Sequence, residues 1–208
     1  MSTAFTDSGY QPKQLHLQQA SRIGRKNTFQ TNYEDVYKEH KKGSRISVFV
    51  DGSNLFYLQK DFLHWSIDLR KVLNYLSKSG VIVDAAIYSS VDPNNDSQRA
   101  HLKSLAYAGF RVEKKFIKPF TDKDGNIAYK ANMDVDIAVD MFNQIDNYDT
   151  AVLVSGDGDF ARALQILHAR GKQFKVLSTS KVLSHELRSI AGMHYTDFED
   201  IRDLIERY

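Results

Sequence analysis

The chain has 208 residues, enough for one domain and an appendage. Its hydrophobic share of 42% supports a packed core, and the lack of cysteine excludes disulfides and thiolate metal sites. No apolar run has the length of a bilayer span, and the polar start does not resemble a signal peptide. We therefore expect a cytoplasmic protein with no membrane partner. A net charge of +2 is too small to identify a nucleic-acid partner by itself.

The positive charge is concentrated near the N-terminus. Before Arg45 the chain has seven lysines and arginines against four acids, and little apolar periodicity up to about residue 30. This composition predicts that residues 1–43 form a basic, partly disordered arm. A short amphipathic helix is possible at 32–42, with Gly43 as its end. The arm is a candidate contact for a homodimer or a protein partner.

Strand and helix patterns alternate from residue 44 to residue 208, which we take as one domain. Alternation of this kind predicts an α/β fold with a mostly parallel sheet and helices on both faces. A turn is expected at 122–126, where Asp-Gly is typical of hairpins. The expected strands are 46–50, 81–88, 110–117, 150–155 and 174–177, and the expected helices are 54–61, 68–79, 96–108, 133–146, 159–169, 184–191 and 197–208.

Aspartates occur where the apolar runs end. Asp51 follows the first expected strand, and Asp157 and Asp159 follow the strand at 150–155. The helix after residue 133 carries three more, Asp134, Asp136 and Asp140. Sites in parallel sheets form outside the carboxyl ends of the strands. Carboxylates that converge there favour a hard cation such as Mg²⁺ or Mn²⁺, and a metal-dependent phosphoryl-group enzyme.

All of these aspartates except Asp157 also have a purely structural interpretation. Asp51 and Asp159 are each placed to cap a following helix, and Asp134 suits the first turn of its helix. Asp136 and Asp140 share one helix face, which could simply be solvated. Asp157 lies between two glycines and is more easily explained as a ligand than as a cap.

Three motifs in order resemble a known family. They are Phe-Val-Asp-Gly-Ser-Asn-Leu at 49–55, Asp-Val-Asp-Ile-Ala-Val-Asp-Met at 134–141, and Val-Ser-Gly-Asp-Gly-Asp-Phe at 154–160. Together they resemble the NYN domain, in its LabA-like branch of the PIN-like nuclease superfamily, over about residues 45–195. The resemblance implies a PIN-like three-layer α/β/α sandwich, an acidic pocket for Mg²⁺ or Mn²⁺, and endoribonuclease activity.

The resemblance also assigns residues. Asp51, Asp134, Asp157 and Asp159 match the acids of the family's motifs, and Asn54 matches the asparagine that follows the first acid. Lys130 also falls in the second motif region, where the chain departs from the family by having Ala131 in place of a frequent glycine.

We therefore expect Asp51, Asp134, Asp157 and Asp159 to be catalytic and to bind the metal, with Asp136 and Asp140 as secondary ligands or supporting groups. Asn54, Ser155 and Lys130 are expected to orient water or a phosphate oxygen. The expected substrate is RNA, single-stranded or structured. Candidate RNA contacts are Arg99, Lys103, Lys114, Lys115 and Lys118, with Tyr57, Tyr88 and Phe120 as possible stacking partners for bases.

Two other functions fit the same residues. The first is a catalytically weak RNA-binding or regulatory module that keeps the acidic pocket. The second is a phosphatase-like enzyme, because Val-Phe-Val-Asp-Gly suggests an aspartyl nucleophile at Asp51. Such enzymes usually carry a second aspartate two positions later, where this chain has Ser53.

Overall fold

The computed structural model describes residues 43–121 and 127–208, with only the backbone described at 118–121 and 127–130. The basic arm, its possible helix and the turn expected at 122–126 therefore lie outside the described residues. Within the described part, no helix is long and apolar enough to cross a membrane.

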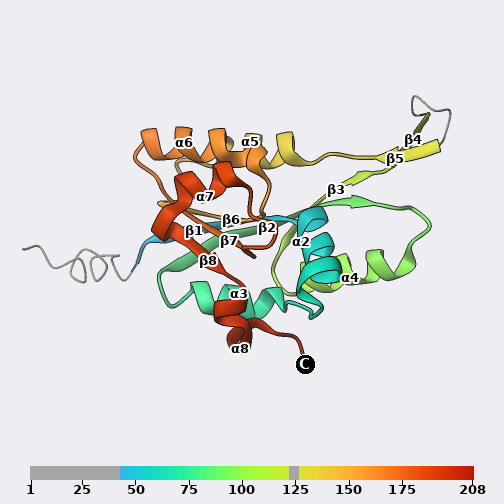
Figure 1. The fold of residues 1–208 in the computed structure, drawn as a ribbon, viewed down its shortest axis with the longest axis horizontal. Helices are drawn as coiled ribbons and strands as arrows, with labels where there is room; N and C mark the ends of the chain where they lie inside the picture. Colours follow the sequence, from blue (N-terminus) through green and yellow to red (C-terminus); the bar gives the residue numbers. More distant parts are fainter. Residues whose placement is uncertain (1–42, 122–126) are drawn as a thin grey trace, which may run out of the picture.

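A six-stranded sheet forms the middle of the domain (Figure 1). Its strand order is β3-β2-β1-β6-β7-β8, and every neighbouring pair is parallel. This confirms the α/β fold expected from the sequence. The strands are β1 (Arg45–Asp51), β2 (Val81–Val91), β3 (Arg111–Phe116), β6 (Thr150–Val154), β7 (Gln173–Ser178) and β8 (Tyr195–Asp197).

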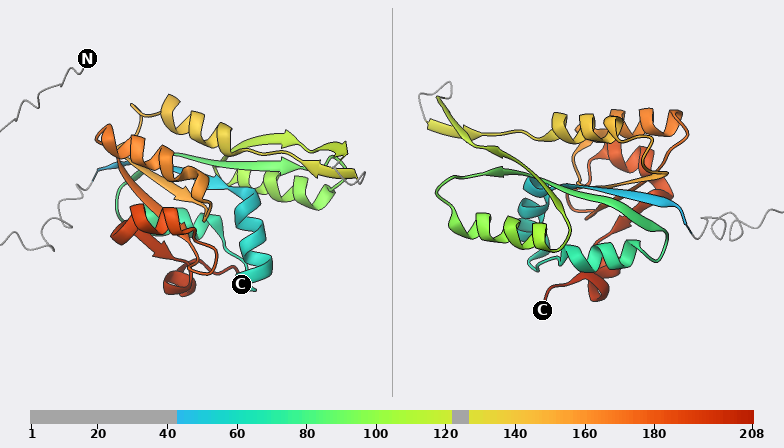
Figure 2. Two further views of the ribbon diagram at one scale, coloured as in Figure 1. Left: turned by 45° about the horizontal axis from the view of Figure 1, so that its top comes forward. Right: turned by 180° about the vertical axis from the view of Figure 1, so that it is seen from behind.

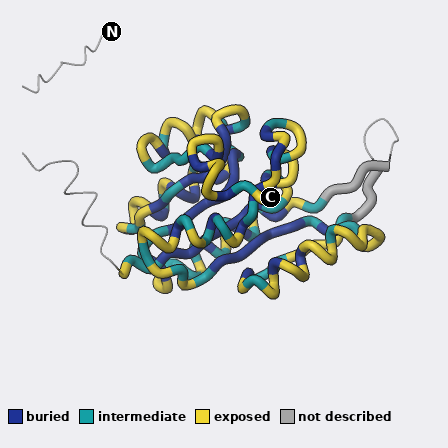
Figure 3. The backbone as a smooth tube through the Cα atoms, turned by 90° about the horizontal axis from the view of Figure 1, so that it is seen from below, coloured by how far each residue is buried: buried dark blue, intermediate teal, exposed yellow. Residues whose placement is uncertain are grey.

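The central strands consist mostly of buried residues, drawn dark blue in Figure 3. Along β1, Val48 and Val50 pack into one hydrophobic cluster, whereas Phe49 between them packs into another. This division follows from the strand geometry, because successive side chains point to opposite faces. Two cores therefore sandwich the sheet, and the continuous apolar run of β1 is explained.

Helices cover both faces and complete three layers (Figures 1 and 2). The first layer holds α5 (Asp134–Asn143), α6 (Ala161–Ala169) and α7 (His185–Ala191); the second holds α2 (Gly52–Leu58), α3 (Leu69–Leu76), α4 (Asp96–Tyr107) and α8 (Arg202–Ile205). Short π- and 3₁₀-helical turns occur at Gln59–Leu63, Gly158–Phe160, Gly192–His194 and Glu199–Ile201.

Two regions depart from the expected elements. An antiparallel ribbon, β4 (Lys118–Thr121) with β5 (Ile127–Lys130), projects beyond the main sheet (Figure 1). The prediction of a helix at 197–208 is wrong for its first part, because the chain first forms β8 and then two short helical segments. Asp197 explains this difference: its carboxylate accepts hydrogen bonds from the backbone N–H of Ser180 and Glu199 and so fixes the end of β8.

The order of the strands determines where a site forms. From β1 the chain moves outward to β2 and β3, then returns to β6 on the other side of β1 and moves outward again. The connections from β1 and β6 therefore leave toward opposite faces of the sheet, α2 to one and α6 to the other. Such a switch point leaves a crevice at the carboxyl ends of the two strands. Asp51 ends β1, and Asp157 follows β6.

The opposite ends of these strands are held together by Arg45 and Asp149. The Arg45 guanidinium donates to both carboxylate oxygens of Asp149, and the Arg45 backbone N–H donates to Oδ2 at 2.9 Å. The Arg45 carbonyl accepts from the Asp149 N–H. These hydrogen bonds, led by the one from the Arg45 side chain, lower the pKa of Asp149 to about 2.

We predict that Asp149→Asn destabilises the protein in a pH-dependent way. Because the folded-state pKa is depressed, the stabilisation from Asp149 is present above its unfolded pKa and disappears as the pH falls through about 2. Urea unfolding should give a larger difference in unfolding free energy between wild type and variant at pH 7 than at pH 3. Asp61→Asn is the control, and a pH-independent difference for Asp149→Asn would contradict the prediction.

Candidate metal centre

Three aspartates from two segments meet at the switch point. Asp134 begins α5, and Asp157 and Asp159 lie in the loop and 3₁₀ turn after β6. One carboxylate oxygen from each lies within 4.8 Å of the others. Clustered carboxylate oxygens are the ligands that Mg²⁺ and Mn²⁺ prefer, so the donor set fits a hard divalent cation.

Asp51 lies beside this cluster and is buried, with 5% of its surface exposed. Its carboxylate accepts hydrogen bonds from the Asn54 N–H at 3.0 Å and the Ser155 hydroxyl at 3.1 Å. Burial raises the pKa of Asp51, the two hydrogen bonds oppose the rise, and the charges of Asp134 and Asp157 add to it. A bound cation would reverse this last effect and favour the ionised carboxylate. The four aspartates expected to act together therefore gather at one edge of the sheet.

The two strand ends are connected by side chains. Asn54 accepts a hydrogen bond from the Gly156 N–H at 3.1 Å, which joins α2 to the loop after β6. The Ser155 hydroxyl donates to Asp51 and accepts from the Asp157 N–H at 3.2 Å. Ser155 was expected to orient water or phosphate, but it is fully buried and instead orients the carboxylate of Asp51.

In the loop after β6, the residue that caps the following helical segment is not the one expected from the sequence. The sequence suggested that Asp159 caps the following helix, but Asp157 does so: its carboxylate accepts from the Asp159 N–H at 3.0 Å. The flanking glycines are explained by packing. A Cβ at Gly156 would lie 2.9 Å from the Ser178 hydroxyl oxygen, and one at Gly158 would lie 2.9 Å from that of Ser184. Both glycines therefore let neighbouring elements approach the loop closely.

A residue that sequence reasoning missed, Asn132, positions the start of α5. Its side-chain oxygen accepts from the Asp134 N–H at 2.6 Å. Asparagine just before a helix is a typical capping signal, so this role could have been read from the sequence. The hydrogen bond holds the backbone that carries the Asp134 carboxylate.

Asp136 and Lys115 form an ion pair between α5 and β3. Asp136 was expected as a secondary ligand, and Lys115 as an RNA contact. Both side chains are partly exposed, but each has the other as a partner. The pair joins the helix that carries Asp134 to the sheet.

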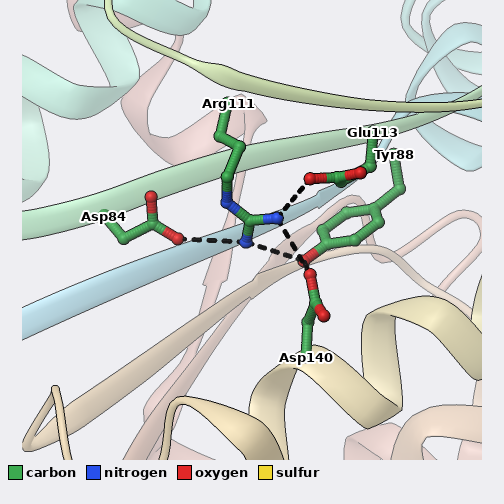
Figure 4. A network of polar contacts seen from close by, with 5 residues as sticks. All are labelled: Asp84, Tyr88, Arg111, Glu113 and Asp140. Carbon is green, nitrogen blue, oxygen red and sulfur yellow. Dashed lines mark hydrogen bonds and ion pairs between the residues drawn. The ribbon is translucent and has the colours of Figure 1, made fainter.

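Asp140 belongs to a polar network on the sheet (Figure 4). The Tyr88 hydroxyl donates to Asp140 at 2.7 Å, and the Arg111 guanidinium donates to the same oxygen at 2.9 Å. Arg111 also pairs with Asp84 and Glu113. Burial and the hydrogen bond to Asp140 raise the pKa of Tyr88. Asp140 therefore anchors α5 instead of facing the cluster, and Tyr88, which is fully buried, does not stack on a base.

We predict that Arg111→Ala lowers the free energy of unfolding by about 1.5–3 kcal/mol, the usual range for lost hydrogen bonds to charged groups. The substitution leaves Asp84, Glu113 and Asp140 facing one another without the cation between them. Thermal unfolding would measure the loss. Arg99→Ala is the matched control, because Arg99 pairs only locally with Asp96 on α4. Equal midpoints for the two variants would contradict a stabilising role for the network.

The remaining RNA candidates are distributed over several surfaces. Arg99 pairs with Asp96, Lys103 lies over the Tyr107 ring and Lys114 over the Phe116 ring. Tyr57 is half exposed and contacts Phe62 edge to face. The side chains of Lys118, Phe120 and Lys130 lie outside the described residues.

A parallel α/β/α sandwich with acids at its switch point is the arrangement expected of a PIN-like nuclease domain. The chain belongs to the NYN domain family, a PIN-like nuclease family, whose model matches residues 45–199. The resemblance inferred from the three motifs is therefore confirmed.

One similar protein supports this assignment, and one solved structure supports the fold. The chain is 40% identical over 168 residues to the "Low amplitude and bright protein LabA" of Synechococcus elongatus, a match that covers 79% of this chain and 89% of that protein. A crystal structure of a protein of unknown function from Vibrio parahaemolyticus has a TM-score of 0.66 and 24% identity, covering 79% of this chain and 98% of that one. The second match shows the fold alone.

Proposed function

We propose that this protein is a metal-dependent endoribonuclease that hydrolyses phosphodiester bonds in RNA. The observation that carries the proposal is the convergence of Asp134, Asp157 and Asp159 beside the buried Asp51. Membership of a PIN-like nuclease family supports the same chemistry.

Each aspartate has a distinct part in the proposed site. Asp134, Asp157 and Asp159 would hold one or more Mg²⁺ or Mn²⁺ ions. Asp51 would contribute a carboxylate held in place by Ser155 and the Asn54 N–H. A bound ion would supply activation of a water molecule and stabilisation of charge on the phosphate. Asp157 has a double role, since its carboxylate also fixes the backbone of Asp159.

Substrate binding is proposed to rest mainly on backbone phosphates. Lys103 and Lys114 are candidates on the described surface, although each lies over a neighbouring aromatic ring. The basic arm before Arg45 would add positive charge or contact a protein partner.

We predict that the full-length protein cleaves a circular single-stranded RNA, which has no ends for an exonuclease, in Mn²⁺ or Mg²⁺ but not in EDTA. Asp51→Asn and Asp157→Asn should each lower the rate by about 100-fold or more, the scale of losing an interaction made in the transition state. Gel analysis of the RNA over time is the measurement.

Asp203→Asn is the matched control, because Asp203 is exposed on α8 in the layer opposite α5. Equal rates for wild type and both site variants would show that a contaminant cleaves the RNA. Binding of RNA without cleavage under any metal condition would instead favour the catalytically weak RNA-binding module.

A further inference from the structure

A cleft of about 930 Å³ lies between α2 and α4, in the helix layer that also contains α3 and α8. The C-terminal parts of β2 and the start of α3 close its other sides. Gly52 and Ser53, which follow Asp51 directly in the chain, are among the residues that line it. One wall of the cleft therefore starts one residue after Asp51, although none of the four aspartates lines the cleft.

The interior of the cleft combines apolar and polar surface. Leu55, Ile87, Leu102 and Leu105 provide apolar side chains, while serine hydroxyls are spread along its walls. The hydroxyls of two lining residues, Ser53 and Ser90, lie 3.3 Å apart. An apolar pocket with a few placed polar groups is typical of a small-molecule or nucleoside site.

The walls of the cleft are fixed by hydrogen bonds. Gln98 on α4 donates to the Ser90 carbonyl at 2.7 Å and accepts from the Asp92 N–H at 3.0 Å. Asn95 caps α4 by accepting from the Gln98 N–H at 2.9 Å. These bonds hold α4 against the end of β2, so the space between α4 and α2 is built into the fold.

An exposed aromatic ring lines this space. Phe56 on α2 is 68% exposed, although large apolar side chains usually lose most of their surface on folding. Single-stranded RNA is commonly recognised by stacking of its unpaired bases on such rings. The sequence prediction named Tyr57, Tyr88 and Phe120 for this role, but neither Tyr57 nor Tyr88 lines the cleft, and the side chain of Phe120 lies outside the described residues.

Positive charge lies at the same cleft. His101 and Arg207 both line it, and the Arg207 charge, after burial, contributes to lowering the pKa of His101. Among the described residues, Arg207 has no ion-pair partner. Because the lowered pKa favours the neutral form of His101, the cation at this cleft that suits a phosphate group is Arg207.

We propose that this cleft binds an unpaired nucleoside of a single-stranded RNA, with its base against Phe56 and a neighbouring phosphate near Arg207. The inference rests on the proposed function for its substrate class, since the strand would continue from the cleft to the aspartates. It adds a base-binding subsite that the acidic cluster does not provide.

The test is binding of a fluorescent single-stranded oligoribonucleotide, measured by anisotropy with the full-length protein in EDTA so that no metal-dependent cleavage interferes. Phe56→Ala should weaken binding about tenfold, within the range for loss of one base–aromatic contact. Tyr107→Ala is the matched control: Tyr107 is an aromatic residue on α4, 82% exposed, that does not line the cleft. This control should change binding less than twofold.

A second variant tests whether RNA binding requires the open volume of the cleft. Ala100 lines the cleft on an exposed part of α4, so Ala100→Trp should fill it and weaken binding to a similar extent without lowering the unfolding midpoint.

Unchanged binding in both cleft variants overturns the inference while leaving the nuclease proposal intact. No binding by the wild type also overturns it. Binding that depends on Phe56 in a protein that never cleaves RNA would keep the subsite and refute the nuclease. If Phe56→Ala separates a dimer and leaves RNA binding unchanged, the ring belongs to an interface between copies, and the inference fails.

Discussion

The parallel pairing of β1 with β6 is the constraint on which the candidate site depends. In this register Val50 pairs with Val154, so Asp51 and Ser155 leave the sheet side by side. The hydrogen bonds from Ser155 to Asp51 and from the Gly156 N–H to Asn54 then join the two strand ends. Without this pairing, acids separated by about a hundred residues in the sequence would not meet.

The anchoring of α5 is the second requirement, because this helix brings Asp134 to the same edge. Its first turn is held by Asn132, and its later part by the bonds from Tyr88 and Arg111 to Asp140. Asp136 adds an ion pair to Lys115. The three aspartates of this helix therefore have different surroundings. Asp134 belongs to the acidic cluster, whereas Asp136 and Asp140 attach the helix to β2 and β3.

The sequence predicted most of the fold, because apolar strands and amphipathic helices produce clear local patterns. The hydrogen-bond and ion-pair partners of each aspartate could not be predicted from the sequence in the same way. Asp140 could not be separated from a metal ligand by spacing alone, since its partners Tyr88 and Arg111 come from distant strands. The cap at Asp157 was misassigned because a 3₁₀ turn precedes α6 and moves the start of the helical segment. The cleft beside Phe56 depends on the separation of α2 and α4, which no local pattern encodes.

We propose that the aspartates at the switch point hold a divalent cation together. Crystals of the full-length protein grown with Mn²⁺ test this claim directly through anomalous scattering at the manganese edge. We predict an anomalous peak about 2.1 Å from carboxylate oxygens of Asp134, Asp157 and Asp159, with Asp51 adjacent. A clear map with no peak at these carboxylates, from protein whose RNA cleavage requires Mn²⁺, would contradict it.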